Sequence, residues 1–179
     1  MTPVKRLALN LGAPGDRKDA CGGLWLGYPR PSGSLVLQLQ VGLKLFPGGG
    51  YFNHDAARLQ IQDPDKPWLF CSGVHGLRQC TIPLAEPADG AARYTVRLAF
   101  AELDHAAVGK RVSDIKLQGQ VVAQNFDVFR EAGGRNKPLI KEFPGIDADQ
   151  ELAVEFVPVA ANPAPDQLPV LQGIEIVRE

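Results

Sequence analysis

The feature that most constrains this chain is a strict alternation of polarity in its second half. In residues 94–100, the side chains of Tyr94, Val96, Leu98 and Phe100 fall on one face and the three intervening side chains on the other. A two-residue period indicates a half-buried β-strand, because successive side chains of a strand point to opposite sides of the sheet. Residues 151–156 repeat the pattern, so we expect both segments to face one core.

Turn residues separate the remaining segments. The chain has 19 Gly and 15 Pro among 179 residues, and the stretches between them are mostly too short for helices. This spacing is typical of an all-β domain, and we predict an antiparallel β-sandwich. Further strands are expected at residues 4–11, 34–45 with a break at Gly42, 68–72, 138–143 and 170–177. A short helix is expected only near residues 56–59 or 104–108.

Two hairpin turns are predicted from glycine positions. Gly119 follows Gln118 between two short apolar segments, where a tight turn requires a positive φ. A second hairpin is placed at His75-Gly76, and pairing outward from that turn sets Cys71 opposite Cys80. A disulfide between Cys71 and Cys80 is therefore one alternative, and two free buried thiols are the other.

Length and charge limit the possible functions. A chain of 179 residues matches one domain with a core of its own, and a net charge of −1 argues against nucleic-acid binding. The basic pairs Lys5-Arg6 and Lys110-Arg111 are isolated, and we interpret them as surface residues. We expect no membrane insertion and find no signal peptide, although a domain excised from an exported protein would look the same.

Catalytic motifs are not evident in the sequence. The triplet Gly48-Gly49-Gly50 lacks the Lys-Ser/Thr of a phosphate loop and is interpreted as a turn. Glu102, Asp104 and His105 form the one local cluster of carboxylates with imidazole, but a polar loop after a strand is the favoured interpretation. His54-Asp55 is a similar case beside aromatic residues. We therefore predict no catalytic residues, no metal and no cofactor.

Several segments, taken in order, resemble the malectin and malectin-like domains. They are residues 94–102, 109–115, 125–134, 141–143, 152–156 and 173–177, and a weaker match continues through residues 22–29 and 68–77. The resemblance implies a jelly-roll, galactose-binding-like sandwich that spans residues 1–179 as one malectin-like domain. It also implies a non-catalytic carbohydrate-binding role.

The resemblance assigns candidate sugar contacts to loops at one end of the sandwich. Malectin holds sugar with aromatic side chains and an acid, which correspond here to Tyr51, Phe52 and Asp166. The loop that carries malectin's aromatic pair retains only His75, and Tyr28 is a further candidate. Flat rings cover the C–H face of a sugar, and a carboxylate accepts hydrogen bonds from its hydroxyls.

Two functional hypotheses follow from the resemblance. The first is a carbohydrate-binding module that binds an oligosaccharide or glycan within a larger, exported bacterial protein, in the periplasm or at the cell surface. The alternative is a structural or protein-interaction domain that keeps the scaffold without the sugar site. In the alternative, the candidate aromatics close the end of the sandwich. Trp25 and Trp68 are expected in the core.

Overall fold

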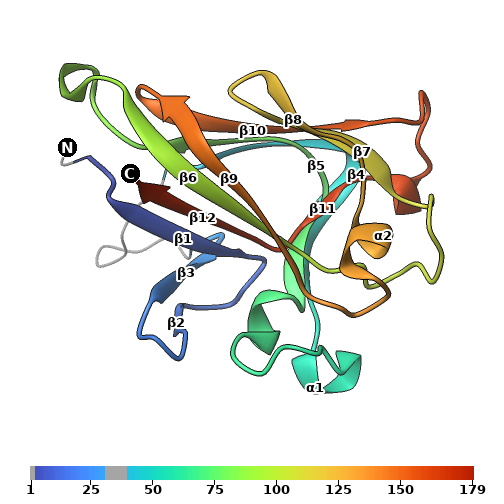
Figure 1. Ribbon diagram of the computed structural model, residues 1–179. Coiled ribbons are helices and arrows are strands. Elements are labelled where there is room, and N and C mark those ends of the chain that lie inside the picture. The colour runs from blue at the N-terminus through green and yellow to red at the C-terminus, as the bar shows by residue number, and fades with distance from the viewer. Residues whose placement is uncertain (1–2, 31–39) are drawn as a thin grey trace.

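Two β-sheets face each other across one core (Figure 1), which confirms the predicted all-β sandwich. The computed structural model describes residues 3–30 and 40–179. The first sheet has the order β2–β3–β1–β12–β6–β9, and the second has the order β11–β5–β10–β7–β8, with β4 paired to β5. Neighbouring strands run antiparallel except β1 and β3, which are parallel.

The strands of the first sheet are β1 (Arg6–Leu11), β2 (Arg17–Lys18), β3 (Leu24–Tyr28), β6 (Ala92–Phe100), β9 (Leu139–Ala148) and β12 (Gly173–Arg178). Those of the second sheet are β4 (Gly42–Asn53), β5 (Ser72–Pro83), β7 (Val112–Leu117), β8 (Gln120–Asp127), β10 (Glu151–Pro158) and β11 (Val170–Leu171). Short helices are α1 (Ala56–Leu59) and α2 (Val128–Ala132), and 3-10 turns are η1 (Pro67–Leu69), η2 (Pro87–Asp89) and η3 (Pro165–Gln167).

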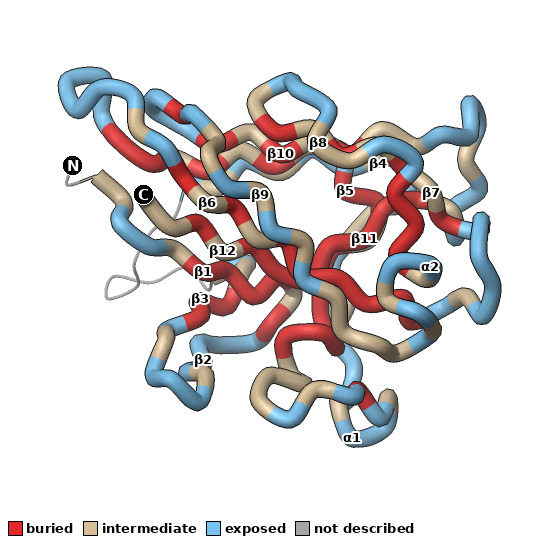
Figure 2. Tube along the Cα trace, viewed as in Figure 1, coloured by how far each residue is buried: buried red, intermediate tan, exposed pale blue. Residues whose placement is uncertain are grey.

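The core lies between the inner faces of the sheets, where buried segments of both layers meet in Figure 2. All four alternating side chains of β6 are fully buried, as are Leu152 and Val154 of β10. Phe100 packs against Phe126 and Phe156, with ring centroids 4.8 and 6.2 Å away. Polarity alternation therefore predicted the inward faces of these strands correctly.

The predicted hairpin at His75-Gly76 is wrong. Both residues lie inside β5, which continues to Pro83. Gly76 does take a positive φ of 72°, but it serves an irregularity in the pairing with β4, where a Cβ at Gly76 would lie 2.8 Å from the Gly49 Cα. Gly76 therefore marks a bulge within the strand pair and not a hairpin turn.

This correction also removes the geometry for a disulfide. Cys71 directly precedes β5 and Cys80 lies near the far end of the same strand, so the two cannot face each other across a hairpin. Both are buried free thiols. Burial raises the pKa of Cys80 to about 12, so this thiol packs as a small apolar side chain.

Of the smaller structural predictions, some are confirmed and others are wrong. The hairpin at Gln118-Gly119 and the helix at residues 56–59 are confirmed. Residues 67–69 form η1 instead of a strand, and no helix forms at residues 104–108. Gly42 begins β4 instead of interrupting a strand, and the predicted strand residues 34–39 lie outside the described residues. The triplet at residues 48–50 lies within β4, at its pairing irregularity.

A second apolar cluster lies on the outer face of the first sheet. Leu9 of β1 points into the main core, so its neighbour Ala8 points outward, and the segment of residues 54–71 covers that outer face with Ile61, Leu69 and Phe70. Trp25 is buried in this cluster, as expected. Trp68 only borders it and stays partly exposed, so the expectation that both tryptophans are core holds for one of them.

Candidate functional site

A cavity of about 350 Å³ opens where the end of β4 meets the loops that precede β7 and β11. Three of the five sequence-predicted residues line it, namely Phe52, His75 and Asp166. The other lining residues are His54, Ala101, Leu103, Asp104, Arg111, Pro165, Val170 and Gln172. The cavity therefore combines an aromatic wall with carboxylates, a guanidinium and an amide.

The alternation of β4 separates Phe52 from its neighbour Tyr51. Phe52 pairs with Gly73 of β5, and because this glycine has no side chain, the phenyl ring lies across it, with its Cζ 2.8 Å from where a Cβ would be. Tyr51 pairs with Val74 and points to the other side of the sheet. One residue of register thus decides which aromatic ring reaches the cavity.

Tyr51 and Tyr28 form a separate aromatic pair. Their ring centroids are 6.4 Å apart in an edge arrangement, and the Tyr28 hydroxyl donates a hydrogen bond to the Val41 carbonyl at 3.0 Å. Burial of the Tyr51 phenol raises its pKa to about 12, so it stays protonated as a donor. Neither tyrosine is among the lining residues, so the structure does not bring them together with the other three.

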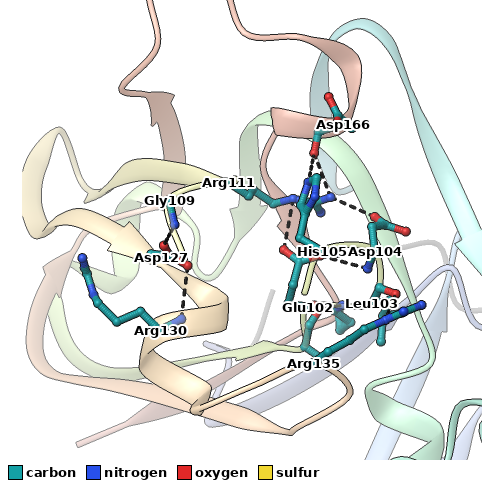
Figure 3. Close-up of polar contacts among 12 residues, drawn as sticks. Glu102, Leu103, Asp104, His105, Gly109, Arg111, Asp127, Arg130, Arg135 and Asp166 are labelled. Atoms are coloured by element: carbon teal, nitrogen blue, oxygen red, sulfur yellow. Dashed lines mark hydrogen bonds and ion pairs between the residues drawn. The ribbon is translucent and has the colours of Figure 1, made fainter. Parts of the chain in front are cut away.

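Arg111 organises the polar side of the cavity (Figure 3). Its side chain is 3% exposed, and Nη2 donates to Asp104 Oδ2 at 2.8 Å and to the Asp166 carbonyl at 3.0 Å. Its Nε lies 3.4 Å from Oε2 of the buried Glu102. The interpretation of Lys110-Arg111 as a surface pair is therefore wrong for Arg111.

Glu102 folds the loop that carries Asp104. Its Oε1 accepts the backbone N–H groups of Asp104 and His105 at 3.0 and 3.1 Å. His105 Nε2 lies 2.7 Å from the Asp166 carbonyl oxygen and donates to it. The segment is thus more than a polar loop, because its buried Glu102 carboxylate holds the loop backbone and its His105 imidazole fastens it to η3 on the opposite rim (Figure 3).

The far end of this loop is fastened to α2. The Gly109 N–H donates to Asp127 Oδ2 at 2.5 Å, and Asp127 also caps α2 through Arg130 N–H at 3.2 Å. Arg135 Nε donates to the Leu103 carbonyl at 2.8 Å. These contacts hold the Asp104 rim of the cavity in one arrangement (Figure 3).

The floor of the cavity includes a buried amide that sequence inspection did not single out. Gln172 is fully buried between β11 and β12, and its Nε2 donates to the Ala101 carbonyl at 2.8 Å. Its Oε1 has no hydrogen-bond partner among the described residues. No local pattern marks Gln172 or Arg111, because their roles depend on partners far away in the sequence.

His75 is held in its neutral form. Burial and the nearby positive charge of Arg111 lower its pKa from the ordinary value of 6.5, against a backbone hydrogen bond with Pro165 and the charges of Asp104 and Asp166, which raise it. A neutral imidazole offers both a donor and an acceptor to a ligand hydroxyl.

The lowered pKa of His75 predicts a loss of stability in mild acid. The unfolded chain binds the proton more tightly than the folded one, so the free energy of unfolding falls as pH drops through 6.5 and levels off below the lowered folded-state value. Denaturant titrations across this range check it. His75→Gln should flatten the dependence relative to wild type, and an equal pH slope in both proteins would contradict the assignment.

Across residues 3–30 and 40–179, no group of three or more His, Cys, Asp or Glu side chains could hold a metal ion. Within the same residues, no helix is long and apolar enough to span a bilayer.

Comparison with known families tests the resemblance to malectin domains that the sequence indicates. The family model of the malectin domain matches residues 44–160, which is more than half of the chain. The chain belongs to the malectin domain family. The match runs from within β4 through β10 and therefore includes Phe52, His75, Asp104 and Arg111, whereas Asp166 and Gln172 lie beyond it.

Curated relatives of this malectin domain are plant receptor kinases. A probable LRR receptor-like serine/threonine-protein kinase of Arabidopsis thaliana, At1g07650, is 43% identical over 60 residues, which is 30% of this chain and 6% of that protein. A probable receptor-like protein kinase of the same plant, At1g30570, is 32% identical over 87 residues, or 48% of this chain and 10% of that one. The chain thus spans a tenth or less of either relative.

Solved structures share the fold at low identity. The plant receptor-like kinase ANX2 superposes with a TM-score of 0.71 at 17% identity, covering 96% of this chain and 47% of that one. β-Glucuronidase 2 of Bacteroides uniformis gives a TM-score of 0.68 at 18% identity, covering 97% of this chain and 18% of that enzyme. The ANXUR2 extracellular domain of Arabidopsis thaliana has a similar structure. The same malectin-like fold therefore occurs in receptor ectodomains and as a small part of a larger enzyme.

Proposed function

We propose that this malectin domain is a non-catalytic carbohydrate-binding module whose site is the cavity lined by Phe52, His75 and Asp166. The observation that carries the proposal is the convergence of an aromatic ring and two acidic residues on one cavity. The Phe52 ring offers a flat apolar surface for a sugar C–H face, and Asp104 and Asp166 offer acceptors for hydroxyl groups. The cavity volume lies within the range of small-molecule sites.

The charges around the cavity favour a neutral sugar. Asp104 and Asp166 are exposed at the rim, whereas the single guanidinium of Arg111 is already engaged by Glu102 and Asp104. An acidic sugar would bring a further negative charge beside two acidic residues, and no free cation among the described residues of the cavity wall would offset it. Hydroxyl groups, in contrast, can donate to both carboxylates.

Neighbouring aromatic residues give a matched pair for testing the site. Phe52→Ala should weaken glycan binding about tenfold, because it removes the stacking surface of the cavity. Tyr51→Ala should leave binding within about twofold, since its ring points to the other side of the sheet. A glycan array identifies the sugar, and calorimetric titration of both variants measures the effect. Equal losses in the two variants, or no binding across a broad panel of α- and β-linked glycans, would reject the proposal.

A protein-interaction role is the second candidate. Leu45 and Tyr51 on β4 are large apolar side chains with 36% and 43% exposure, at the edge of the second sheet. A chain with the same fold occurs in the solved complex of the plant peptide RALF23 with FER and LLG2. In that complex the fold is therefore part of a protein assembly. Loss of partner capture on Tyr51→Ala, with no effect of Phe52→Ala, would favour this candidate.

The setting of the module is part of the same proposal. We infer one domain over residues 1–179 within a larger exported protein, at the cell surface or in the periplasm. Support comes from the small share of each relative that the chain spans and from matches described as extracellular domains. Protease protection of the whole chain as one unit tests the domain boundary.

A further inference from the structure

A second cavity, of about 310 Å³, lies on the other side of the β4 end. Its wall includes Asn10, Arg17, Asn53, His54, Asp55 and Trp68. His54 also lines the cavity assigned above, so one residue stands between the two. A ligand long enough to reach both cavities would pass over His54.

The His54 side chain can form part of a continuous ligand-binding surface between the two cavities. It is exposed, and its ring lies 5.5 Å from the Phe52 ring with a tilt of 32°. Its backbone N–H donates to the Cys71 carbonyl at 2.9 Å, which fixes the strand end on which it stands. The aromatic surface that begins at Phe52 thus continues over the imidazole to the border of the second cavity.

Trp68 contributes an aromatic surface to the second cavity, and neighbouring side chains fix the position of its ring. Trp25 packs edge-on against it at a centroid distance of 6.2 Å, and the Trp25 indole N–H donates to Asp19 at 3.2 Å. The Arg17 guanidinium lies over the Trp68 ring, 5.9 Å from its centroid. A tryptophan that only served the core would be covered, whereas this one is left partly open in the cavity wall.

The polar groups beside Trp68 match a neutral polyhydroxyl ligand. Arg17 can donate hydrogen bonds, Asn53 can both donate and accept them, and the wall carries one positive and one negative side chain, Arg17 and Asp55. We propose that the cavity at Trp68 is a second sugar subsite, so that this domain binds a linear oligosaccharide running across His54. The inference rests on the proposed sugar site at Phe52 and extends it.

Ligand length gives the test. The probes are ladders of linear α-linked and β-linked gluco-oligosaccharides, from disaccharide to hexasaccharide, titrated by calorimetry and by tryptophan fluorescence. We expect affinity to rise about tenfold once the chain reaches the second cavity, in at least one ladder, because a second aromatic surface is then covered. Fluorescence should change at the same length, since Trp68 borders the cavity and Trp25 is buried.

Variants separate the second subsite from the first. Trp68→Phe, Arg17→Ala and Asn53→Ala should each reduce the gain from length and leave disaccharide affinity within about twofold. Lys18→Ala, the neighbour of Arg17 on β2, is the matched control and should keep the full gain. Phe52→Ala should weaken every length.

The outcomes distinguish this inference from the function on which it rests. Disaccharide binding that depends on Phe52 but does not strengthen with length would overturn the second subsite alone. Failure of every ladder to bind would overturn the second subsite, and absence of binding across the broad glycan panel as well would overturn the sugar site. A gain from length that survives all three variants would also overturn the subsite at Trp68.

Discussion

Arg111→Ala should lower the free energy of unfolding by about 3–5 kcal/mol, the cost of removing one partner from a buried ion pair. The guanidinium is 3% exposed, and its loss leaves Glu102, at 1%, as an uncompensated buried charge. The same change frees the Asp104 carboxylate and leaves the Asp166 carbonyl with His105 as its partner, so the two rims of the cavity are held together less tightly. Denaturant unfolding measures the stability, and glycan titration measures the site.

Arg93→Ala is the matched control for Arg111→Ala. Arg93 pairs with Asp147 at 3.6 Å, but the two side chains are 66% and 81% exposed, so we expect a change within about 1 kcal/mol. The double variant Arg111→Met with Glu102→Gln should recover much of the stability, because it removes both charges and keeps an acceptor for the loop N–H groups. It should not recover sugar affinity. Similar losses for Arg111→Ala and Arg93→Ala would show that the buried network does not support the fold.

Arg111 also shows where sequence inspection fails. Lys110 and Arg111 are adjacent and look alike in sequence, yet one is exposed and the other is buried. The difference arises from Glu102, nine residues earlier, and from the Asp166 carbonyl, 55 residues later. No local pattern encodes such partners, because they meet only after the strands have paired.

Alternation of polarity along a strand, in contrast, depends on local burial and predicted the inward faces correctly. Tyr94 and Phe100 lie in the core because a strand in this sandwich buries every second side chain. The same rule, applied to Tyr51 and Phe52, would have shown that the two rings cannot share a site. They were assigned to a loop, where alternation does not hold, but both belong to β4.

His75 was predicted as a site residue for a reason that the structure does not support. It was placed in a hairpin loop, whereas it lies within β5, paired with Val170 of β11. It still reaches the cavity because β11 directly follows η3, which carries Asp166. The candidate site is therefore formed by strand pairing as much as by loops, and its geometry depends on the backbone beneath it.

Gly12→Ala tests that dependence on the backbone. Gly12 follows β1 with a φ of 70°, and a Cβ there would collide with the Phe52 carbonyl oxygen and lie 2.7 Å from the Gly73 carbonyl oxygen. A left-handed backbone costs a non-glycine residue about 1–2 kcal/mol, and forcing β4 and β5 aside adds about 1–3 kcal/mol. We expect a total loss of about 3–4 kcal/mol in the free energy of unfolding, measured in denaturant.

Gly22→Ala isolates the contribution of the collision at Gly12. Gly22 has a φ of 81° with no atom within 4 Å of its added Cβ, so it should lose only the backbone part, about 1–2 kcal/mol. Because Gly12 touches the strand residues on which Phe52 stands, Gly12→Ala should also weaken sugar binding under conditions where it remains folded, and Gly22→Ala should not. Equal stability losses would mean that β4 and β5 yield without cost. Undiminished binding in folded Gly12→Ala would mean that the position of Phe52 does not depend on this close approach.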